Sequence, residues 1–359
     1  MRFLGLIPQR FLGVDVGTSA IRMVELSGWA GRKKLENYGE IPATVFYKKE
    51  FRTIEKDSLS LSTKELGKAI KAVMDEAQIE TNKVAFSIPD FSTFFTTIEL
   101  PPMTLKEVPQ AVRAEARRHV PMPLGEVTLD WQLTNKPAKG KKENLRILLA
   151  TVPNEVINQY QSIAEELGLN LLALEAEIFG LMRALIAKGE RGSIAIVDIG
   201  GRSTTCSIVS KNILKVSHSF DVSGNDLTER ISKGLSTDYK EAENLKKEYG
   251  ITSTGGGLKE AGVRETLLPL IDVIIREIDN VFKGFSLRER KNVEKIILAG
   301  GTAFMPGLFE YFKKHFTEQE IKFADPFKNI FYPPILNKVT KKIGPAYAIA
   351  TGMALRGLQ

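Results

Sequence analysis

The beginning of the chain alternates short apolar runs with polar turns, a pattern typical of strands. Residues 11–26, FLGVDVGTSAIRMVEL, are expected to form two strands around a turn, and residues 35–42 a third strand. Ser62 and Glu65 then form a capping box that opens a helix, and residues 83–89 add a strand ended by proline. This strand-strand-strand-helix-strand order predicts a layered α/β fold.

Residues 92–153 follow a different rhythm. The runs TFFTTIELP, EVTLDWQLT and NLRILLATVP predict three strands, and a helix is expected from Thr104 to about His119, its start shifted slightly later by Pro109. We therefore predict a strand-helix-strand-strand insertion. Its last two strands flank NKPAKGKKE, which we interpret as a solvated lysine-rich turn and not as a site for anionic lipid or nucleic acid. The aromatic side chains of the insertion fit either a core or a groove for a partner peptide.

The pattern of the opening stretch returns after a helix, a strand and a second helix over residues 154–188. SIAIVDIGGRSTTCSIVSKN, residues 193–212, again ends an apolar strand near an aspartate, Asp198, followed by glycines, small hydroxyl residues and a second apolar strand. A duplicated hairpin of this kind predicts two related halves that face one another. The second half is rich in predicted helices and closes with KIGPAYAIATGMALRGL, residues 342–358.

Composition limits the classes of partner and cofactor. The chain has 359 residues, 43% of them hydrophobic, which is enough for about two domains. Lys and Arg outnumber Asp and Glu by 50 to 43, and because this excess is spread along the chain we expect no nucleic-acid partner. One cysteine and three widely separated histidines predict neither a disulfide nor a histidine–cysteine metal site. No apolar run is long enough to span a bilayer, so we expect a cytoplasmic protein.

Asp15 lies between valines in the first predicted strand, and burying a lone carboxylate costs free energy unless a cation faces it. The glycine and hydroxyl residues that follow allow backbone N–H groups to converge on an anion. Two such hairpins facing one another would hold nucleotide phosphates, while Asp15 and Asp198 would hold Mg²⁺ directly or through water. Arg22 lies beyond the turn, where it would meet a β-phosphate. The alternative is that each aspartate only caps its own turn.

A third glycine site lies in IILAGGTAFMPGL, residues 296–308, where a predicted strand ends in Gly300 and Gly301 before a helix. Glycines at such a place allow a flat ligand or a phosphate to approach the backbone at a helix N-terminus. The alternative is close packing of the strand against the helix.

At these places the sequence resembles the actin/Hsp70/sugar-kinase ATPase superfamily. VDVGTSAIR is similar to its first phosphate loop, VDIGGRSTT to its second and ILAGGTAFMPGL to its adenosine motif, while LEAEIFGLMRAL and GPAYAIATGMAL resemble its two connecting helices. The resemblance extends over nearly the whole chain. It implies a two-domain actin-like α/β fold of the ribonuclease H-like type, with ATP and Mg²⁺ as ligands.

Further stretches resemble the PilM family of type IV pilus assembly proteins, which is related to the division protein FtsA. EARRHVPMPLGEVTLDWQL is similar to a helix-turn-strand segment of that family, and VSGNDLTERISKGLSTDYKEAENLKKEYG to its Gly-Asn-x-x-Thr…Ala-Glu-x-x-Lys…Tyr-Gly run. The insertion resembles the SHS2-type subdomain that replaces the usual insertion of actin. The expected domains are a first actin-like domain of residues 1–91 and 154–191 with a C-terminal helix 343–359, the insertion 92–153, and a second actin-like domain 192–342.

The resemblance assigns roles to individual residues. Glu177, or less favourably Glu175, matches the side chain that positions the attacking water, and its alternative role is an acid that interacts with a helix dipole. The family implies ATP binding with slow or negligible hydrolysis. The residues expected around the nucleotide are Gly17, Thr18, Ser19, Arg22, Gly200, Gly201, Ser203, Thr204, Gly224, Asn225, Glu243, Lys246, Lys247, Gly300, Gly301 and Thr302, with Asp15 and Asp198 as metal ligands.

The resemblance also implies a partner. PilM proteins bind the N-terminal cytoplasmic tail of PilN, so this chain is expected beside the inner-membrane pilus assembly platform, with membrane contact only through the partner. The peptide would lie between the first domain and the insertion, in a groove whose shape ATP sets; self-association is left open. One alternative is an FtsA-like division protein, disfavoured because the chain stops at ALRGLQ without a membrane-binding helix. The other is a small-molecule kinase, disfavoured because the insertion shows no polar cluster for a sugar.

Overall fold

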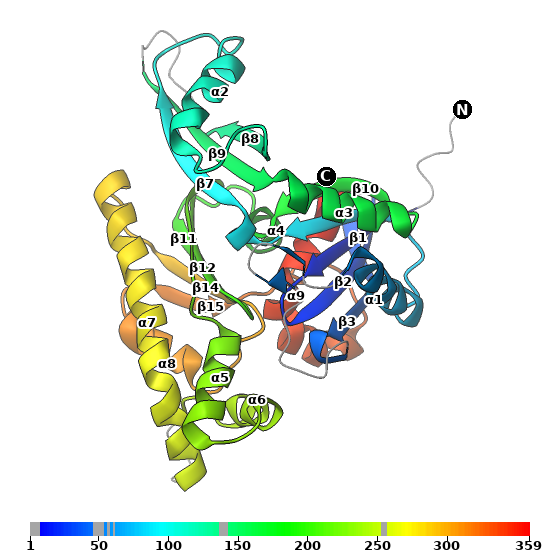
Figure 1. Ribbon diagram of the computed structural model, residues 1–359, viewed down its shortest axis with the longest axis vertical. Helices are drawn as coiled ribbons and strands as arrows, with labels where there is room; N and C mark the ends of the chain where they lie inside the picture. Colours follow the sequence, from blue (N-terminus) through cyan, green and yellow to red (C-terminus); the bar gives the residue numbers. More distant parts are fainter. Residues whose placement is uncertain (1–7, 46–53, 56–57, 60–61, 136–142, 253–256) are drawn as a thin grey trace.

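The computed structural model describes residues 8–45, 54–55, 58–59, 62–135, 143–252 and 257–359 (Figure 1). Two five-stranded sheets stand beside each other with helices around them, and a smaller three-stranded sheet lies at one end. The lysine-rich turn expected in the insertion falls at 136–142, outside the described residues. No helix in the described part of the chain is long and apolar enough to cross a membrane.

The first sheet has an antiparallel hairpin and third strand on one side and two parallel strands on the other. Its order is β10-β6-β1-β2-β3, formed by β1 (Gln9–Val16), β2 (Ala20–Trp29), β3 (Arg32–Pro42), β6 (Lys83–Ile88) and β10 (Asn170–Ala176). One face packs on α1 (Thr63–Glu76) and α3 (Asn154–Glu166), and the other on α9 (Asn337–Gly357). The predicted capping box opens α1, where the Ser62 side chain accepts from the Glu65 N–H. Two short strands, β4 (Ile54–Glu55) and β5 (Ser58–Leu59), pair separately.

The second sheet repeats the topology of the first, position by position. Its order is β15-β14-β11-β12-β13, formed by β11 (Ser193–Ile199), β12 (Thr204–Ser210), β13 (Ile213–Phe220), β14 (Lys295–Ala299) and β15 (Glu320–Phe323). As in the first sheet, three strands are antiparallel neighbours and two join in parallel. The expectation of two related halves, drawn from the duplicated aspartate hairpin, is therefore confirmed.

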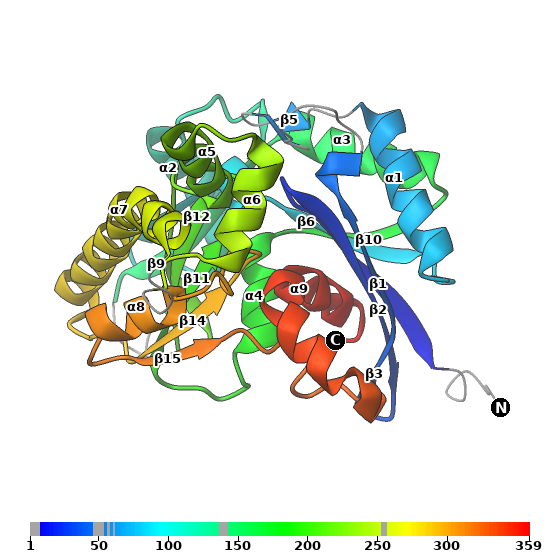
Figure 2. The same ribbon diagram turned by 90° about the horizontal axis from the view of Figure 1, so that it is seen from below.

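Helices fill the space on both faces of the second sheet. The outer face packs on α5 (Gly224–Leu235), α7 (Leu258–Glu289) and α8 (Leu308–His315), with α6 (Tyr239–Glu248) beside α5 (Figure 2). The inner face packs on α4 (Glu177–Leu185) and α9, so these two helices lie between the halves. Both halves therefore share one apolar layer, and the loops at the ends of their central strands face each other.

The insertion has the predicted strand-helix-strand-strand order. It consists of β7 (Phe94–Leu100), α2 (Val108–His119), β8 (Val127–Leu133) and β9 (Leu145–Pro153), with β9 in the centre of its sheet. Its apolar side chains form a core of their own, which includes Ile98, Val112 and Ile147. Trp131 packs partly buried against this core, and Phe94 is 37% exposed.

Two helix boundaries differ from the sequence expectation. Helix α2 begins at Val108 and not at Thr104, because Pro109 has no N–H to bond to the carbonyl four residues earlier. In the turn ahead of it, the N–H and hydroxyl of Thr104 both donate to the Glu107 carboxylate. Helix α9 begins at Asn337, ahead of the expected 343, and continues through Pro345. The chain returns to the first sheet earlier still, because the connection between β15 and α9 already buries apolar side chains against β2 and β3.

Candidate functional site

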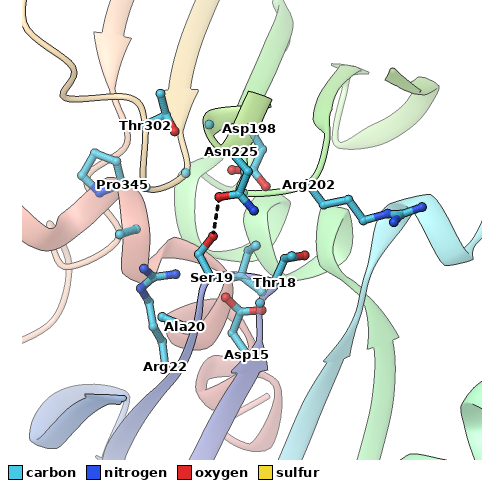
Figure 3. Close-up of a pocket in the computed structure, with 18 of the residues that line it drawn as sticks. Asp15, Thr18, Ser19, Ala20, Arg22, Asp198, Arg202, Asn225, Thr302 and Pro345 are labelled. Carbon is cyan, nitrogen blue, oxygen red and sulfur yellow. Dashed lines mark hydrogen bonds between the residues drawn. The ribbon is translucent and has the colours of Figure 1, made fainter. Parts of the chain in front are cut away.

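A cavity of about 680 Å³ lies where the hairpins of the two halves face one another (Figure 3). The β1–β2 and β11–β12 turns lie on opposite sides, the start of α4 and the α5–α6 pair add further walls, and the glycines after β14 complete it. The expected site residues that line it are Asp15, Gly17, Thr18, Ser19, Arg22, Glu177, Asp198, Gly200, Gly201, Ser203, Gly224, Asn225, Glu243, Lys246, Lys247, Gly300, Gly301 and Thr302.

The opposing turns approach closely enough to require glycine. The Ser19 hydroxyl of the first turn donates to the Asn225 side chain of the second half over 3.2 Å. A Cβ placed on Gly201 would lie 2.1 Å from the Ser19 Oγ, and one on Gly300, whose φ is +90°, would lie 2.4 Å from Asp198 Oδ1. Side chains at these two positions would separate the halves or displace the acid, so the backbone itself forms this part of the wall.

Asp15 is supported by protein groups. Its side chain is buried, and Oδ1 accepts a hydrogen bond from the Ser87 hydroxyl over 2.8 Å. Burial raises the pKa of Asp15, while Arg22 on the paired strand and the Ser87 hydrogen bond lower it and Glu40 raises it further. Arg22, expected at a β-phosphate, donates to Glu40 over 2.6 Å and still lines the cavity.

Asp198 lacks such support. Its Oδ1 is buried and has no hydrogen-bond partner among the described residues. Burial raises the pKa of Asp198 to about 7, with the nearby Asp15 raising it and Arg22 opposing. An acceptor left unsatisfied at a cavity wall fits a hard cation held by carboxylates together with ligand oxygens and water. The described residues contain no cluster of three or more His, Cys, Asp or Glu side chains suited to a metal.

Glu177 is the first residue of α4, and two hydrogen bonds join this end of the helix to Asp90. The Asp90 N–H donates to the Glu177 carboxylate over 3.1 Å, and the Asp90 carboxylate accepts from the N–H of Ile178 over 3.2 Å. Asp90 therefore caps α4, and Glu177 is directed into the cavity. Burial raises the pKa of Glu177 well above its ordinary value, and Asp90, Asp15 and Asp198 add to this. The alternative, Glu175, instead pairs with Arg183 and Arg356, each over 2.7 Å.

The α5–α6 wall contains a buried lysine that is bonded to protein. The Lys246 ammonium donates to the Gly224 carbonyl over 2.8 Å and the Thr228 hydroxyl over 2.6 Å, and it pairs with Glu243 over 2.7 Å. Burial lowers the pKa of Lys246, opposed by Glu243. Burial would raise the pKa of Glu243, but Lys246 and Thr228 outweigh it, so that pKa is lowered. Lys246 thus joins α5 to α6 at the cavity edge, while Lys247 is largely exposed.

Thr204 is the one expected site residue that does not line the cavity. Its side chain is fully buried and donates to the Val222 carbonyl over 2.6 Å, whereas Ser203 and Thr205 face the cavity. Side chains alternate between the two faces of a strand, so one step along the chain changes the face. The sequence could not fix this because the exact end of the glycine turn sets which residues point inward.

Arg202 was missed by the sequence interpretation. It follows Gly200 and Gly201 and lines the cavity (Figure 3). Its guanidinium lies 4.8 Å from the ring centroid of Phe91, the residue before the insertion. The Nε of Arg202 is buried without a hydrogen-bond partner among the described residues. Phe91 also lines the cavity, next to the residue that caps α4. Little in the sequence pointed to a role for Arg202, because the residue it contacts, Phe91, was interpreted only as core or as part of a peptide groove.

Comparison with known proteins identifies related division proteins and actin-like structures. FtsA of Helicobacter pylori is 24% identical over 253 residues, which cover 64% of this chain and 51% of FtsA. The chain spans about half the length of such relatives. Among solved structures, the PilM–PilN type IV pilus biogenesis complex matches with a TM-score of 0.83 at 23% identity, covering 97% of this chain and 98% of that one. MreB5 of Spiroplasma citri bound to AMPPNP matches with a TM-score of 0.54 at 16% identity, covering 93% and 97%.

These structures confirm the expected two-domain actin-like α/β fold with its insertion. A family model described as type IV pilus assembly protein PilM matches residues 13–358, nearly the whole chain. The chain belongs to the PilM family of type IV pilus assembly proteins.

Proposed function

We propose that this chain binds ATP with Mg²⁺ in the cavity between its halves and uses the bound nucleotide to control binding of the PilN N-terminal tail. The observation that carries the proposal is the opposition of two glycine hairpins, each with an aspartate at the end of its central strand, across one cavity. The backbone N–H groups at Gly17 to Ser19 and Gly200 to Ser203 are the proposed phosphate contacts. An actin-like neighbour described as bound to AMPPNP supports the nucleotide class.

Asp15 and Asp198 are the proposed metal ligands, directly or through water. When bound, Mg²⁺ would neutralise the charge of the phosphates and of the acids around them. The unpartnered oxygen of Asp198 fits this role, and Asp15 already has Ser87 as a donor, so we assign the more direct contact to Asp198. Around the base and ribose we place Glu243, Lys246, Lys247 and the glycines before Thr302.

Glu177 is the proposed water-positioning group. Burial and the neighbouring acids raise its pKa, and a carboxyl that keeps its proton orients water but cannot accept a proton from it. The hydrogen bond from Asp90 also uses one of its oxygens. Both features support at most slow hydrolysis, in which nucleotide occupancy and not turnover carries the signal.

The PilN tail is the proposed partner, because a neighbour that matches almost the whole chain was solved as a PilM–PilN complex. We place the tail in a groove between the first domain and the insertion. This assigns the protein to the cytoplasmic face of the inner membrane, within the pilus assembly platform. With the insertion at 92–153, as we propose, that groove would lie beside the nucleotide cavity.

The route of communication follows from where the insertion is attached. At its entry, Asp90 bonds to the start of α4 and Phe91 lies under Arg202 of the second half. Its central strand also contacts the second half, since Leu148 joins the apolar layer between the halves and Arg146 pairs with Glu289 of α7 over 3.4 Å. A ligand that moves one half relative to the other would therefore move the insertion and change the groove.

The test is a titration of the full chain with a synthetic PilN N-terminal peptide, with and without Mg-ATP. We expect Mg-ATP to change the peptide affinity severalfold, and the peptide to change the ATP affinity by the same factor, because binding free energies couple reciprocally. A peptide of the same composition in scrambled order is the control. Peptide binding that ignores Mg-ATP would contradict the coupling, and absence of peptide binding under both conditions would contradict the assigned partner.

A further inference from the structure

The connection between β15 and α9 exposes an unusual group of apolar side chains. Phe331 is 65% exposed, Ile335 is 86% exposed and Val339 is 38% exposed, all within residues 331–339. Single exposed apolar side chains are common on soluble proteins, and Leu287 on α7 is one. Three within one short segment are different, because exposed apolar groups that gather together mark interaction surfaces.

The backbone holds these side chains in fixed positions. Phe331 is bonded to the edge of the first sheet, since its N–H donates to the Lys33 carbonyl over 2.8 Å and its carbonyl accepts from the Leu35 N–H over 2.9 Å. The next residues form a 3-10 turn, Pro334–Leu336, that continues into α9, so Ile335, Lys338 and Val339 lie on one helical face. Figure 2 shows the first turn of α9 beside β3.

Cations surround the apolar side chains. Lys328, Lys338 and Lys341 are exposed, and Lys33 lies on the strand bonded to Phe331. None of these four lysines forms an ion pair within the described part of the chain. Burial lowers the pKa of Lys33 and the nearby Lys188 lowers it further, which shows that positive charge gathers here.

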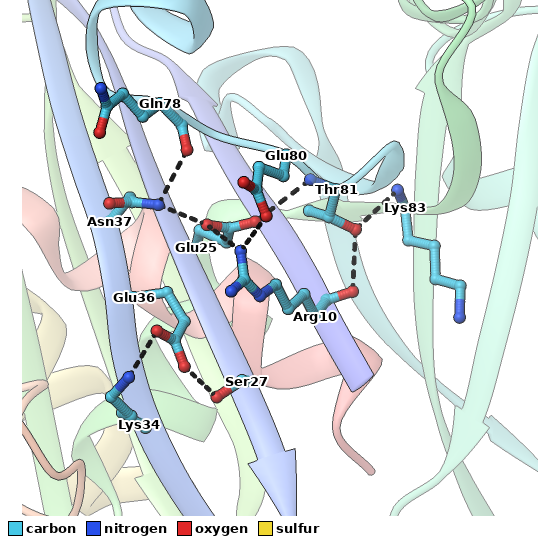
Figure 4. A network of polar contacts seen from close by, with 10 residues as sticks. All are labelled: Arg10, Glu25, Ser27, Lys34, Glu36, Asn37, Gln78, Glu80, Thr81 and Lys83. Carbon is cyan, nitrogen blue, oxygen red and sulfur yellow. Dashed lines mark hydrogen bonds and ion pairs between the residues drawn. The ribbon is translucent and has the colours of Figure 1, made fainter. Parts of the chain in front are cut away.

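Acidic side chains do little to offset this charge. No Asp or Glu occurs between residues 326 and 359. Both acids on the adjoining strand are already bound: Glu36 by Lys34 over 2.7 Å and by the Ser27 hydroxyl over 2.5 Å (Figure 4), and Glu40 by Arg22 over 2.6 Å. The nearest acid along the chain, Asp325, precedes the segment. We name this region the β3–α9 surface and define it by Phe331, Ile335, Val339, Lys33, Lys328, Lys338 and Lys341.

We propose that the β3–α9 surface docks directly on anionic lipid, with Phe331 and Ile335 inserted at the boundary between headgroups and acyl chains and the lysines among the headgroups. Apolar side chains flanked by lysines have the composition that binds anionic membrane interfaces. Pro333 and Pro334 stiffen the segment, so little conformational entropy is lost on docking. A two-fold contact between copies through this surface would oppose like charges, which disfavours self-association as its use.

The surface lies outside the nucleotide cavity, so the proposal goes beyond the function proposed above. It adds a direct membrane contact to the indirect one through the partner. Both contacts are compatible, because a peptide tail tethered to the membrane and a lipid-binding surface on the same protein act together, each raising the effective concentration of the other.

The test is sedimentation of the full chain with vesicles of phosphatidylethanolamine, with and without phosphatidylglycerol, in the absence of PilN. We expect binding only to the phosphatidylglycerol vesicles and weaker binding as salt is raised. The double variant Lys338→Glu/Lys341→Glu should bind at least about thirtyfold more weakly, since each cation near an anionic surface contributes roughly fivefold. Phe331→Ser/Ile335→Ser should bind at least about a hundredfold more weakly with all charges retained.

The matched controls are Lys313→Glu/Lys314→Glu on α8, which changes the net charge equally, and Leu287→Ser, which removes an equally exposed apolar side chain elsewhere. Both should bind like the unaltered chain, and thermal unfolding should show that every variant folds. Failure to bind phosphatidylglycerol vesicles, or equal loss in the control variants, would overturn the proposal. A change in the sedimentation mass of the lipid-free protein with the surface variants would identify a contact between copies and overturn it as well.

Discussion

The two glycine hairpins have nearly the same sequence pattern but different surroundings. In the first half, Asp15 accepts a hydrogen bond from Ser87 and lies opposite Arg22 on the paired strand. In the second half, Asp198 has a buried oxygen without a partner among the described residues. The topology of the two sheets is the same, so the difference comes from the side chains around each acid and not from the backbone.

This difference indicates which of the two aspartates would need a bound ligand as its partner. A buried acceptor without a partner is costly, and proteins retain one mainly where something else completes it. The protein supplies a donor to the first acid and, among the described residues, none to the buried oxygen of the second, so we infer that a bound group completes the second. We therefore expect the two aspartates of the duplicated motif to have different roles. Asp15 would support the geometry of the cavity, and Asp198 would make the more direct contact to Mg²⁺.

The largest expected effect comes from Asp198→Asn. The substitution keeps the size of the side chain and removes its charge, so Mg-dependent ATP affinity should fall on the order of a thousandfold. Asp15→Asn should reduce it much less, because Ser87 and Arg22 remain to shape the site. Calorimetric titration with Mg-ATP measures the affinity of both variants. The control is Asp221→Asn, which changes an exposed aspartate directly after β13 in the second half. Equal losses of Mg-ATP affinity in Asp15→Asn and Asp198→Asn would contradict the proposed difference between their roles.

Much of this arrangement was predictable because it depends on local patterns. Alternating apolar residues identified the strands, and the repeated aspartate and glycine turn identified the two halves. These two features require only that neighbouring residues in the chain follow local patterns. The lack of room for a Cβ at Gly201 and Gly300 is different, because it comes from Ser19 and Asp198, which are distant in the chain.

The remaining features depend on contacts between distant segments. Asp90 caps a helix that begins near Glu177, far along the chain, and nothing in its own neighbourhood signals this. Lys246 lies at a motif position expected to contact the nucleotide, yet its ammonium group already donates to three protein acceptors. On β12, Thr205 and not Thr204 faces the cavity, because the length of the preceding turn sets which side chains of the strand point toward it.

A second prediction concerns the effect of pH on the acids around Asp198. Burial raises the pKa of Asp90 from 3.8 to about 7, the Ile178 N–H opposes this and Asp198 adds to it. Below about pH 4 the carboxyl is protonated in both states, whereas between about 4 and 7 only the unfolded chain ionises, so stability falls as pH rises. In ligand-free protein the loss that Asp90 contributes should be on the order of 4 kcal/mol. Asp90→Asn should remove that contribution and leave the one from Asp198, whose pKa is also raised to about 7.

Urea unfolding at several pH values, without nucleotide or Mg²⁺, measures this dependence. Asp198→Asn should lessen it as well, because the raised pKa of Asp198 contributes over the same pH range and its charge helps to raise the pKa of Asp90. Asp221→Asn again serves as the control. If stability in this pH range were the same for Asp90→Asn and the unaltered chain, Asp90 would be ionised in the folded protein.

A third prediction tests the support given to Asp15. Ser87→Ala removes the hydroxyl that donates to the Asp15 carboxylate, and a lost hydrogen bond to a buried charge costs about 2 kcal/mol. Ser207→Ala is the matched control, because this equally buried serine on β12 bonds only to the Ser217 hydroxyl and should cost about 1 kcal/mol. The free energy of unfolding at neutral pH compares them. Equal costs would mean that Asp15 gains no special support from the first half.

The smallest effect is expected at Arg202, which connects the second half to the insertion. Arg202→Ala removes the contact with Phe91, worth about 1 kcal/mol for a partly buried cation–π pair. The factor by which Mg-ATP changes PilN-peptide affinity should therefore shrink by at most about fivefold, because one of the contacts through which the halves move the insertion is lost. Phe91→Leu should shrink the same factor while leaving the arginine in the cavity. The exposed Arg191, replaced by alanine, is the control. If Arg202→Ala weakened ATP binding equally with and without peptide, the arginine would act on the ligand alone, and communication would run through Asp90 and the shared apolar layer.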